Sequence, residues 1–317
     1  MTPVERVPYD EFSMFHENAE EFGLPYDGPP VVRREAVEVG PGRRLSALVW
    51  GEAEPELVFL HGGAQNAHTW DTVALALDRP LVAIDLPGHG HSDGGLAGAL
   101  DPAANARDVA TVIRALAPRA RAVVGMSLGG ITAIALAALE PELVRSLVLV
   151  DITPGVDEYK ASGVMAFVNG PESFDSFDDL LARTVAFSPT RSESSLRRGI
   201  LHNAVQREDG SWVWRYARHR ALDPAAAPSA DPEAVDGDAP TRHHPEFGSL
   251  WDAVSGLAMP VMLARGTAAG SVVDDADEAE LVRRCPHARV EHVTDAGHSI
   301  QGDRPVELAE LIADFVA

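Results

Sequence analysis

A serine stands in a glycine-rich turn at residues 125–130, whose sequence is GMSLGG. A run of β-branched residues precedes this turn and an apolar helical stretch follows it. A G-x-S-x-G turn in that context holds its serine in a strained, exposed bend. Ser127 would stand at a helix N-terminus, where the helix dipole and free N–H groups favour developing negative charge. An ordinary turn serine is the alternative, but the strand before and the helix after favour a nucleophile.

A second glycine-rich turn, with the sequence HGGA at residues 61–64, follows another apolar run. Such a turn can direct backbone N–H groups at the carbonyl oxygen of a bound acyl group. The N–H of Leu128, together with that of Gly63 or Ala64, would form an oxyanion hole in which one donor contributes ~3 kcal/mol. We expect the ring of His61 to tie down this loop rather than to carry a proton.

A histidine near the C-terminus could act as the general base. His298 lies in the sequence AGHS, between an expected strand and the last expected helix. From such a loop its imidazole can reach Ser127. The chain order serine, acid, histidine is also the order expected for a G-x-S-x-G nucleophile.

Two positions compete for the acid that would orient His298. Asp151 stands at the end of an expected strand, whereas residues 265–271, after the next strand, hold no carboxylate before Asp274 and Asp275. Adjacent parallel strands lie ~4.8 Å apart, so a carboxylate on either could reach the same imidazole. Asp151 could instead bond backbone at a hinge, and Asp274 or Asp275 could cap a helix. We predict Asp151 as the acid, because the stretch after the later strand lacks one.

Short strands and apolar helices alternate along most of the chain. Strands are expected over residues 31–39, 44–50, 56–60, 81–85, 122–126, 147–151, 261–264 and 289–293, and helices over 102–116, 128–139, 275–284 and 305–316. This order predicts an α/β fold with a mostly parallel sheet and helices on both faces.

The alternation is interrupted at one place and absent at the start. Residues 1–30 have no strong period and are expected to form an N-terminal arm. Residues 31–153 and 256–317 form the expected core, and 154–255 a helical cap inserted between two strands, above the sheet edge where ligands bind. Within the cap, residues 223–247 carry six acids, one Arg and almost no large apolar side chain, so we expect a disordered loop.

Composition excludes several functions. The 26 basic and 48 acidic residues give a formal charge of −22, which opposes binding to nucleic acid and to anionic membranes. One cysteine, Cys285, allows neither an intramolecular disulfide nor a cysteine metal cluster, and a buried structural thiol is expected. Without a signal-like or membrane-spanning apolar stretch, the protein is expected to be cytoplasmic. The sequence carries no signal of an oligomeric state.

These motifs, with DLPGHGHS at residues 85–92, resemble the α/β-hydrolase fold of serine hydrolases. Within that superfamily, RRGILHN at residues 197–203 and DGSWVWRY at 209–216 resemble a small group of bacterial cytoplasmic carboxylesterases. The resemblance implies hydrolysis of short or branched carboxylic esters without metal or organic cofactor, with a small-molecule ester as the partner. A serine at the elbow would act through an acyl-enzyme.

Other functions use the same residues. Hydrolysis of a carbon–carbon bond or of a lactone needs the same constellation, because the cap determines the substrate. A ligand receptor that has lost turnover is a third possibility, although the complete set of candidate residues weighs against it. Residues 191–220 also hold seven Arg and three acids, which usually form a solvated face but could orient a carboxylate or phosphate of the substrate.

Overall fold

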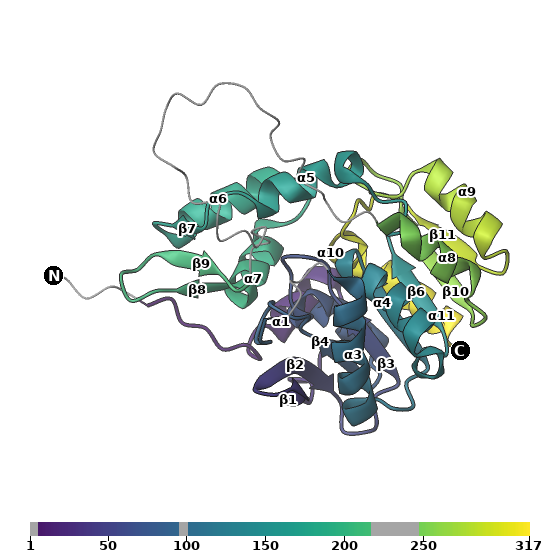
Figure 1. Cartoon of the computed structure of the whole chain (residues 1–317). Coiled ribbons are helices and arrows are strands. Elements are labelled where there is room, and N and C mark those ends of the chain that lie inside the picture. The colour runs from purple at the N-terminus through teal and green to yellow at the C-terminus, as the bar shows by residue number, and fades with distance from the viewer. Residues whose placement is uncertain (1–5, 95–100, 217–246) are drawn as a thin grey trace, which may run out of the picture.

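A computed structural model describes residues 6–94, 101–216 and 247–317 (Figure 1). Its centre is an eight-stranded sheet in the order β1-β2-β4-β3-β5-β6-β10-β11. The strands are β1 (Val32–Gly40), β2 (Arg43–Trp50), β3 (Leu57–Leu60), β4 (Leu81–Ile84), β5 (Ala122–Met126), β6 (Leu147–Val150), β10 (Val261–Gly266) and β11 (Arg289–Val293). The pairs β1–β2 and β2–β4 are antiparallel and the other pairs are parallel, so the predicted strands and the mostly parallel sheet are confirmed.

The sheet is buried on both faces because its central strands are apolar at successive positions. In β3, Val58 and Leu60 point into one apolar cluster, whereas Leu57 and Phe59 point into the other, and all four are fully buried. Successive side chains of a strand alternate between faces, so a continuously apolar strand must be covered on both.

Helices supply the two covering layers. The first cluster receives side chains from α3 (Pro102–Leu116), α4 (Leu128–Leu139), α8 (Leu250–Ser255) and α9 (Asp275–Arg284). The second receives them from α1 (Phe15–Phe22), α2 (Asp71–Leu77), α10 (Ile300–Asp303) and α11 (Pro305–Phe315). The four helices predicted in the core lie at α3, α4, α9 and α11, with ends within one residue of the expectation.

The N-terminal segment differs from the expectation of an arm without regular structure. Helix α1 occupies Phe15–Phe22, ends at Gly23 in the left-handed conformation (φ 64°), and packs into the core. The Phe15 ring lies 4.9 Å from that of Trp50 between centroids, and Phe15 is 2% exposed. Eight residues span about two turns, too few for a clear helical period in the sequence.

The part of the chain from α5 (Glu158–Val168) to β9 (Trp212–Trp214) lies over one edge of the core (Figure 1). It contains the helices α5, α6 (Phe177–Phe187) and α7 (Glu193–Asn203), as expected of a helical cap. It also contains a small antiparallel sheet that the sequence did not predict, with β9 between β7 (Ser173–Phe174) and β8 (Ala204–Gln206). These strands have two or three residues, which is too short for a period-two pattern to be recognised.

One helix within the expected cap range packs against the core. Helix α8 falls within the expected range 154–255, but it packs against α4 and contributes Val254 to the core. The cap has an apolar cluster of its own, which includes Leu180, Ile200 and Trp212. The predicted disordered loop 223–247 lies outside the described residues, except for Phe247, which begins the short helix η3 (Phe247–Ser249).

Two further observations bear on the expectations from composition. Cys285 is buried, and burial raises the pKa of its thiol, as expected of a structural cysteine. Among the helices of the described residues, none is long and apolar enough to cross a membrane.

Candidate active site

The serine turn is strained in the way its glycines predict. Ser127 links β5 to α4. Its backbone has φ 51° and ψ −120°, and residues other than Gly rarely adopt such a positive φ. The strand and the helix approach so closely that a Cβ on Gly129 would overlap the carbonyl oxygen of Leu60, and one on Gly125 would overlap the backbone of Gly129. The glycines therefore permit the bend that holds Ser127 at the start of α4.

The second glycine-rich turn lies beside this serine. A Cβ on Gly62 would stand 3.2 Å from that of Ser127. The N–H of Ala64 already donates to Nε2 of His89 at 3.1 Å, which leaves Gly63 as the donor to pair with Leu128. Leu128 is the first residue of α4, where backbone N–H groups have no partner within the helix. The hydrogen bond of Ala64 therefore favours Gly63 over Ala64 as the candidate donor.

His61 fixes the loop, as expected. The N–H of Leu86 donates to its Nε2 at 2.9 Å, so Nδ1 carries the proton and donates to the carbonyl of Gly62 at 2.7 Å. Burial lowers the pKa of His61, which keeps the ring neutral. Both ring nitrogens are therefore engaged in backbone contacts.

Asp151 follows β6 and His298 follows β11, the strands on either side of β10, and the two side chains meet at this edge of the sheet. Nδ1 of His298 lies 3.0 Å from Oδ2 of Asp151, whose side chain is completely buried. The Asp151 carboxylate also accepts bonds from the N–H groups of Gly266 (3.0 Å) and Val272 (3.0 Å) and from the Ser271 hydroxyl (2.6 Å). A carboxylate held by four donors fixes the imidazole with its proton on Nδ1 and leaves Nε2 as a base.

The competing carboxylates have other partners. Asp274 caps α9 and forms a capping box with Asp277, and it lies 3.0 Å from Nζ of Lys160. Asp275 is 98% exposed at its side chain and pairs with Arg265. Helix capping therefore accounts for Asp274 and an ion pair accounts for Asp275, and the geometry favours Asp151 as the partner of His298.

Two asparagines that the sequence did not single out connect the cap to the oxyanion turn. Nδ2 of Asn203, at the end of α7, donates to the carbonyl of Ala64 at 2.6 Å. Nδ2 of Asn66 donates to the carbonyl of His202 at 3.0 Å. Asn203 ends the RRGILHN motif and Asn66 lies two residues after the HGGA turn, but only their contacts across the cap boundary show that they position the turn beside Gly63.

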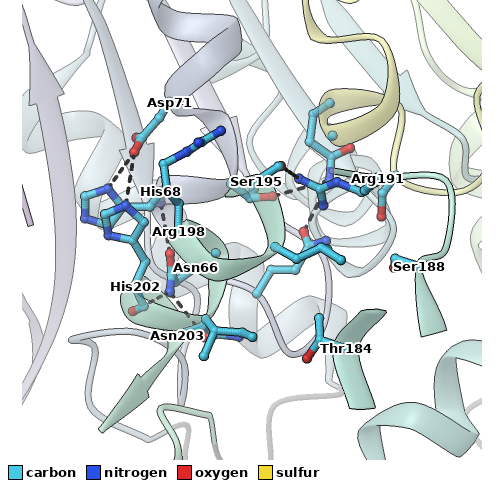
Figure 2. Close-up of a pocket in the computed structure, with 18 of the residues that line it drawn as sticks. Asn66, His68, Asp71, Thr184, Ser188, Arg191, Ser195, Arg198, His202 and Asn203 are labelled. Atoms are coloured by element: carbon cyan, nitrogen blue, oxygen red, sulfur yellow. Dashed lines mark hydrogen bonds and ion pairs between the residues drawn. The ribbon is translucent and has the colours of Figure 1, made fainter. Parts of the chain in front are cut away.

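A pocket lies between the cap and the core (Figure 2). Ala64 of the HGGA turn and the following Gln65 line it, and on the other side so do Ser299, directly after His298, and Gln301 and Gly302 of α10. The cap contributes three aromatic side chains and a set of polar ones, namely Phe167, Phe187, Trp214, Thr184, Ser188, Arg191, Ser195, Arg198, His202 and Asn203. The pocket therefore adjoins both loops that position the candidate catalytic groups.

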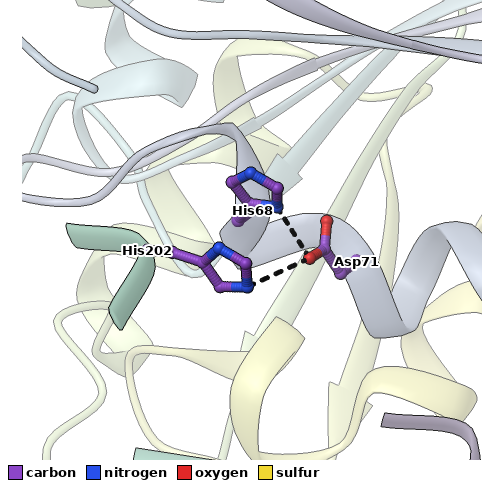
Figure 3. Close-up of side chains that lie close together, drawn as sticks. All are labelled: His68, Asp71 and His202. Atoms are coloured by element: carbon purple, nitrogen blue, oxygen red, sulfur yellow. Dashed lines mark hydrogen bonds and ion pairs between the residues drawn. The ribbon is translucent and has the colours of Figure 1, made fainter. Parts of the chain in front are cut away.

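A second group of titratable side chains is buried and also lines this pocket. It consists of His68, Asp71 and His202 (Figure 3). Their ligand atoms lie within 4.8 Å of one another, which is close enough to consider a metal ion. However, the two imidazoles are stacked, with centroids 3.8 Å apart and planes within 11°, so an ion in the plane of one ring would lie out of the plane of the other. The arrangement fits hydrogen bonds better than metal ligation.

Those hydrogen bonds join three parts of the chain. Nδ1 of His68 lies 2.9 Å from Oδ2 of Asp71, and its Nε2 lies 3.3 Å from Glu11 in the N-terminal segment. Nδ1 of His202 lies 3.0 Å from the Tyr9 hydroxyl. The cluster therefore links the N-terminal segment and cap helix α7 to the core.

This cluster predicts a pH dependence of stability. Burial alone would lower the pKa of His68, but the carboxylates of Asp71 and Glu11 outweigh it and raise that pKa to about 9. The resulting stabilisation is complete below pH ~6.5 and is lost as the pH rises to about 9, an effect of about 3 kcal/mol. In urea titrations, the unfolding free energy of His68→Gln should therefore fall less than that of the wild type over this interval.

The control is His16→Gln, which removes an exposed histidine of α1. Its unfolding free energy should follow the wild-type pH dependence. Equal slopes for wild type and His68→Gln between pH 6.5 and 9 would contradict the buried ion pair.

Comparisons with known proteins agree with this architecture. The family model of the alpha/beta hydrolase fold matches residues 55–305. Esterase Rv0045c of Mycobacterium tuberculosis is 44% identical, over 96% of this chain and 94% of the relative. A solved structure of that esterase matches with a TM-score of 0.80 at 43% identity, over 97% of this chain and 99% of the other. The 2-(acetamidomethylene)succinate hydrolase of Mesorhizobium japonicum is 27% identical, over 83% and 88% of the two chains.

The fold expected from the sequence motifs is thereby confirmed. The matched range includes the oxyanion turn, the serine elbow, the cap and His298. The M. tuberculosis relative extends the likeness over nearly the whole chain, including the N-terminal segment. The chain therefore belongs to the α/β-hydrolase fold family.

Proposed function

We propose that this protein is a serine esterase that hydrolyses short or branched carboxylic esters through an acyl-enzyme. The observation that carries the proposal is the Asp151–His298 hydrogen bond, formed at the same edge of the sheet as a strained serine elbow. The 44% identical relative, which is named an esterase, supports the coarser assignment of ester hydrolysis.

The proposed reaction uses side chains and backbone of this chain alone. Nε2 of His298 takes the proton of Ser127 as its Oγ attacks the ester carbonyl, and the amides of Gly63 and Leu128 bind the oxyanion. The same imidazole, now protonated, gives the proton to the leaving alkoxide. It then deprotonates a water that cleaves the acyl-enzyme, and Asp151 stabilises the imidazolium at each stage.

The pocket gives a reason for the proposed substrate size. Phe167 stacks on Phe187 with centroids 4.3 Å apart, and Trp214 meets Phe167 edge-on at 6.0 Å. This aromatic wall lies on the cap, so an acyl group or alcohol that enters the pocket is enclosed between cap and core. Such enclosure excludes water and favours compact substrates over long chains.

The test is a pre-steady-state experiment with p-nitrophenyl butyrate. We expect a burst of p-nitrophenol equal to the enzyme concentration, followed by slower turnover. A fluorophosphonate should stop the reaction and leave one adduct, which peptide mass mapping should locate at Ser127. Absence of turnover on every ester of an acyl-length panel would contradict the esterase proposal, whereas an adduct at another residue would contradict the role of Ser127.

A further inference from the structure

Arg191 presents a guanidinium to the pocket with few partners of its own (Figure 2). Arg191 lies just before α7, and its Nη2 donates to the Ser195 hydroxyl at 2.6 Å. Among the described residues this is the only hydrogen bond of the guanidinium, and no carboxylate there lies within ion-pair distance. Its Nε is buried without a hydrogen-bond partner. The side chain as a whole is half-buried, and a partly enclosed cation with so few partners is costly, because burial disfavours charge that is not compensated.

Two neighbouring arginines of the cap differ from Arg191 in their surroundings. Arg198, one helical turn beyond Ser194, bonds its hydroxyl and pairs with Glu17 and Glu21 of the N-terminal helix. Arg197 is exposed to solvent, as expected for a solvated face. The first three arginines of the charge run therefore differ: Arg198 is paired, Arg197 is solvated, and Arg191 faces the pocket.

The position of Arg191 relates it to the candidate catalytic groups. A Cβ on Gly302 would lie 2.8 Å from Cζ of Arg191, so the guanidinium rests against the backbone of α10. This helix begins two residues after His298, and Ser299 and Gln301 line the same pocket. A group bound at Arg191 would therefore lie in the cavity that the loop of His298 borders.

We propose that Arg191 binds a carboxylate carried by the substrate, so that the preferred substrates are esters with a second, anionic end. This proposal rests on the proposed esterase function. A half-ester of a dicarboxylic acid has such an end on its acyl side, and an ester of a hydroxy acid has it on its alcohol side. A guanidinium donates to a carboxylate through charge-assisted hydrogen bonds, which are stronger than neutral ones.

A single negative charge fits this end of the pocket better than a doubly charged phosphate. Arg191 is one cation, and the carboxylates of Asp303 and Glu21 are close enough to act on it electrostatically. Arg198 of the following helix α7, a cation that acts on Arg191 electrostatically, is already paired with Glu17 and Glu21. One incoming carboxylate would supply the partner that the half-buried guanidinium lacks, whereas a second negative charge would be repelled by the carboxylates of Asp303 and Glu21.

The experiment compares esters that differ only in charge. On the acyl side, the p-nitrophenyl monoester of adipic acid is compared with that of adipamic acid, in which a carboxamide replaces the carboxylate. On the alcohol side, the acetate ester of 6-hydroxyhexanoate is compared with that of 6-hydroxyhexanamide in a pH-stat. We expect wild-type kcat/KM to favour the anionic member of at least one pair by about 10- to 100-fold, the range of one charge-assisted hydrogen bond.

Variants at two positions assign the preference. Arg191→Met should abolish this preference by lowering kcat/KM for the anionic ester, and Arg191→Lys should restore part of it. Arg197→Met, which removes an exposed cation of α7, should leave the preference unchanged. Adipate should also inhibit wild-type hydrolysis of p-nitrophenyl butyrate competitively and more strongly than adipamide, a readout that does not depend on the folding of a variant.

The outcomes distinguish the proposed carboxylate site from the esterase function on which it rests. If neutral esters are hydrolysed, but neither pair shows a charge preference and adipate inhibits no better than adipamide, the carboxylate site is refuted and the esterase stands. A preference that persists in Arg191→Met would assign the carboxylate to another residue and likewise overturn the proposal. If no ester is hydrolysed at all, the esterase function itself fails.

Discussion

Replacing Asp151 with Asn is expected to lower kcat by about 10⁴, the loss that accompanies the wrong imidazole tautomer. Four donors converge on the carboxylate, with Gly266 N–H and Ser271 O–H at Oδ1, and Val272 N–H and His298 Nδ1 at Oδ2. An asparagine amide must turn its NH₂ toward one of these pairs. In either orientation a backbone N–H loses its acceptor, and the negative charge that stabilises the imidazolium is gone.

The measurement is kcat for p-nitrophenyl butyrate, with Asp274→Asn as the matched control. Asp274 caps α9 and pairs with Lys160, so its loss should cost about 1 kcal/mol of stability or less and leave kcat nearly unchanged. Thermal unfolding of both variants checks that they are folded. A large loss in Asp274→Asn and a small one in Asp151→Asn would reverse the assignment of the acid.

The positions of the candidate catalytic residues could be predicted from the sequence because each is marked by a local pattern. The serine turn needs glycines at fixed offsets, and a strand end fixes where Asp151 emerges, so residue type and spacing indicate both positions. The sequence leaves Asp274 as an alternative to Asp151, because a carboxylate that caps a helix and one that orients a histidine cannot be told apart by sequence alone. The structure distinguishes them through their partners: four donors for Asp151, and a helix end with Lys160 for Asp274.

What the sequence could not predict depends on contacts between distant segments. Tyr9 reaches His202 and Glu11 reaches His68, and neither pair shares a periodic pattern or a motif. Arg191 belongs to the same charge run as Arg197, and only the fold shows that one faces a pocket and the other faces solvent. Short elements were missed for a related reason: α1 and the cap strands take their stability from packing rather than from their own sequence pattern.

Removing Ser127 or His298 is expected to lower kcat by roughly 10⁶ each, and removing both should cost no more than removing one. The reason is that the two side chains perform one step. Without Nε2 of His298, the Ser127 hydroxyl has no base to accept its proton, and without Ser127 the imidazole has no nucleophile to activate. Residual hydrolysis above the rate in water would come from the oxyanion hole and substrate binding, which neither change removes.

This expectation tests the geometry and not only the importance of each residue. Kinetics of Ser127→Ala, His298→Ala and the double variant would be measured with the same ester, and Ser162→Ala, an exposed serine of α5, provides the control. If the losses of the two single variants multiply in the double variant, His298 acts independently of Ser127, and the proposed proton transfer between them is contradicted. If the single and double variants lose the same factor in kcat, the two side chains act in one and the same step. The buried carboxylate of Asp151 would then act on Ser127 only through the ring it orients, so adding Asp151→Asn to Ser127→Ala should change nothing further.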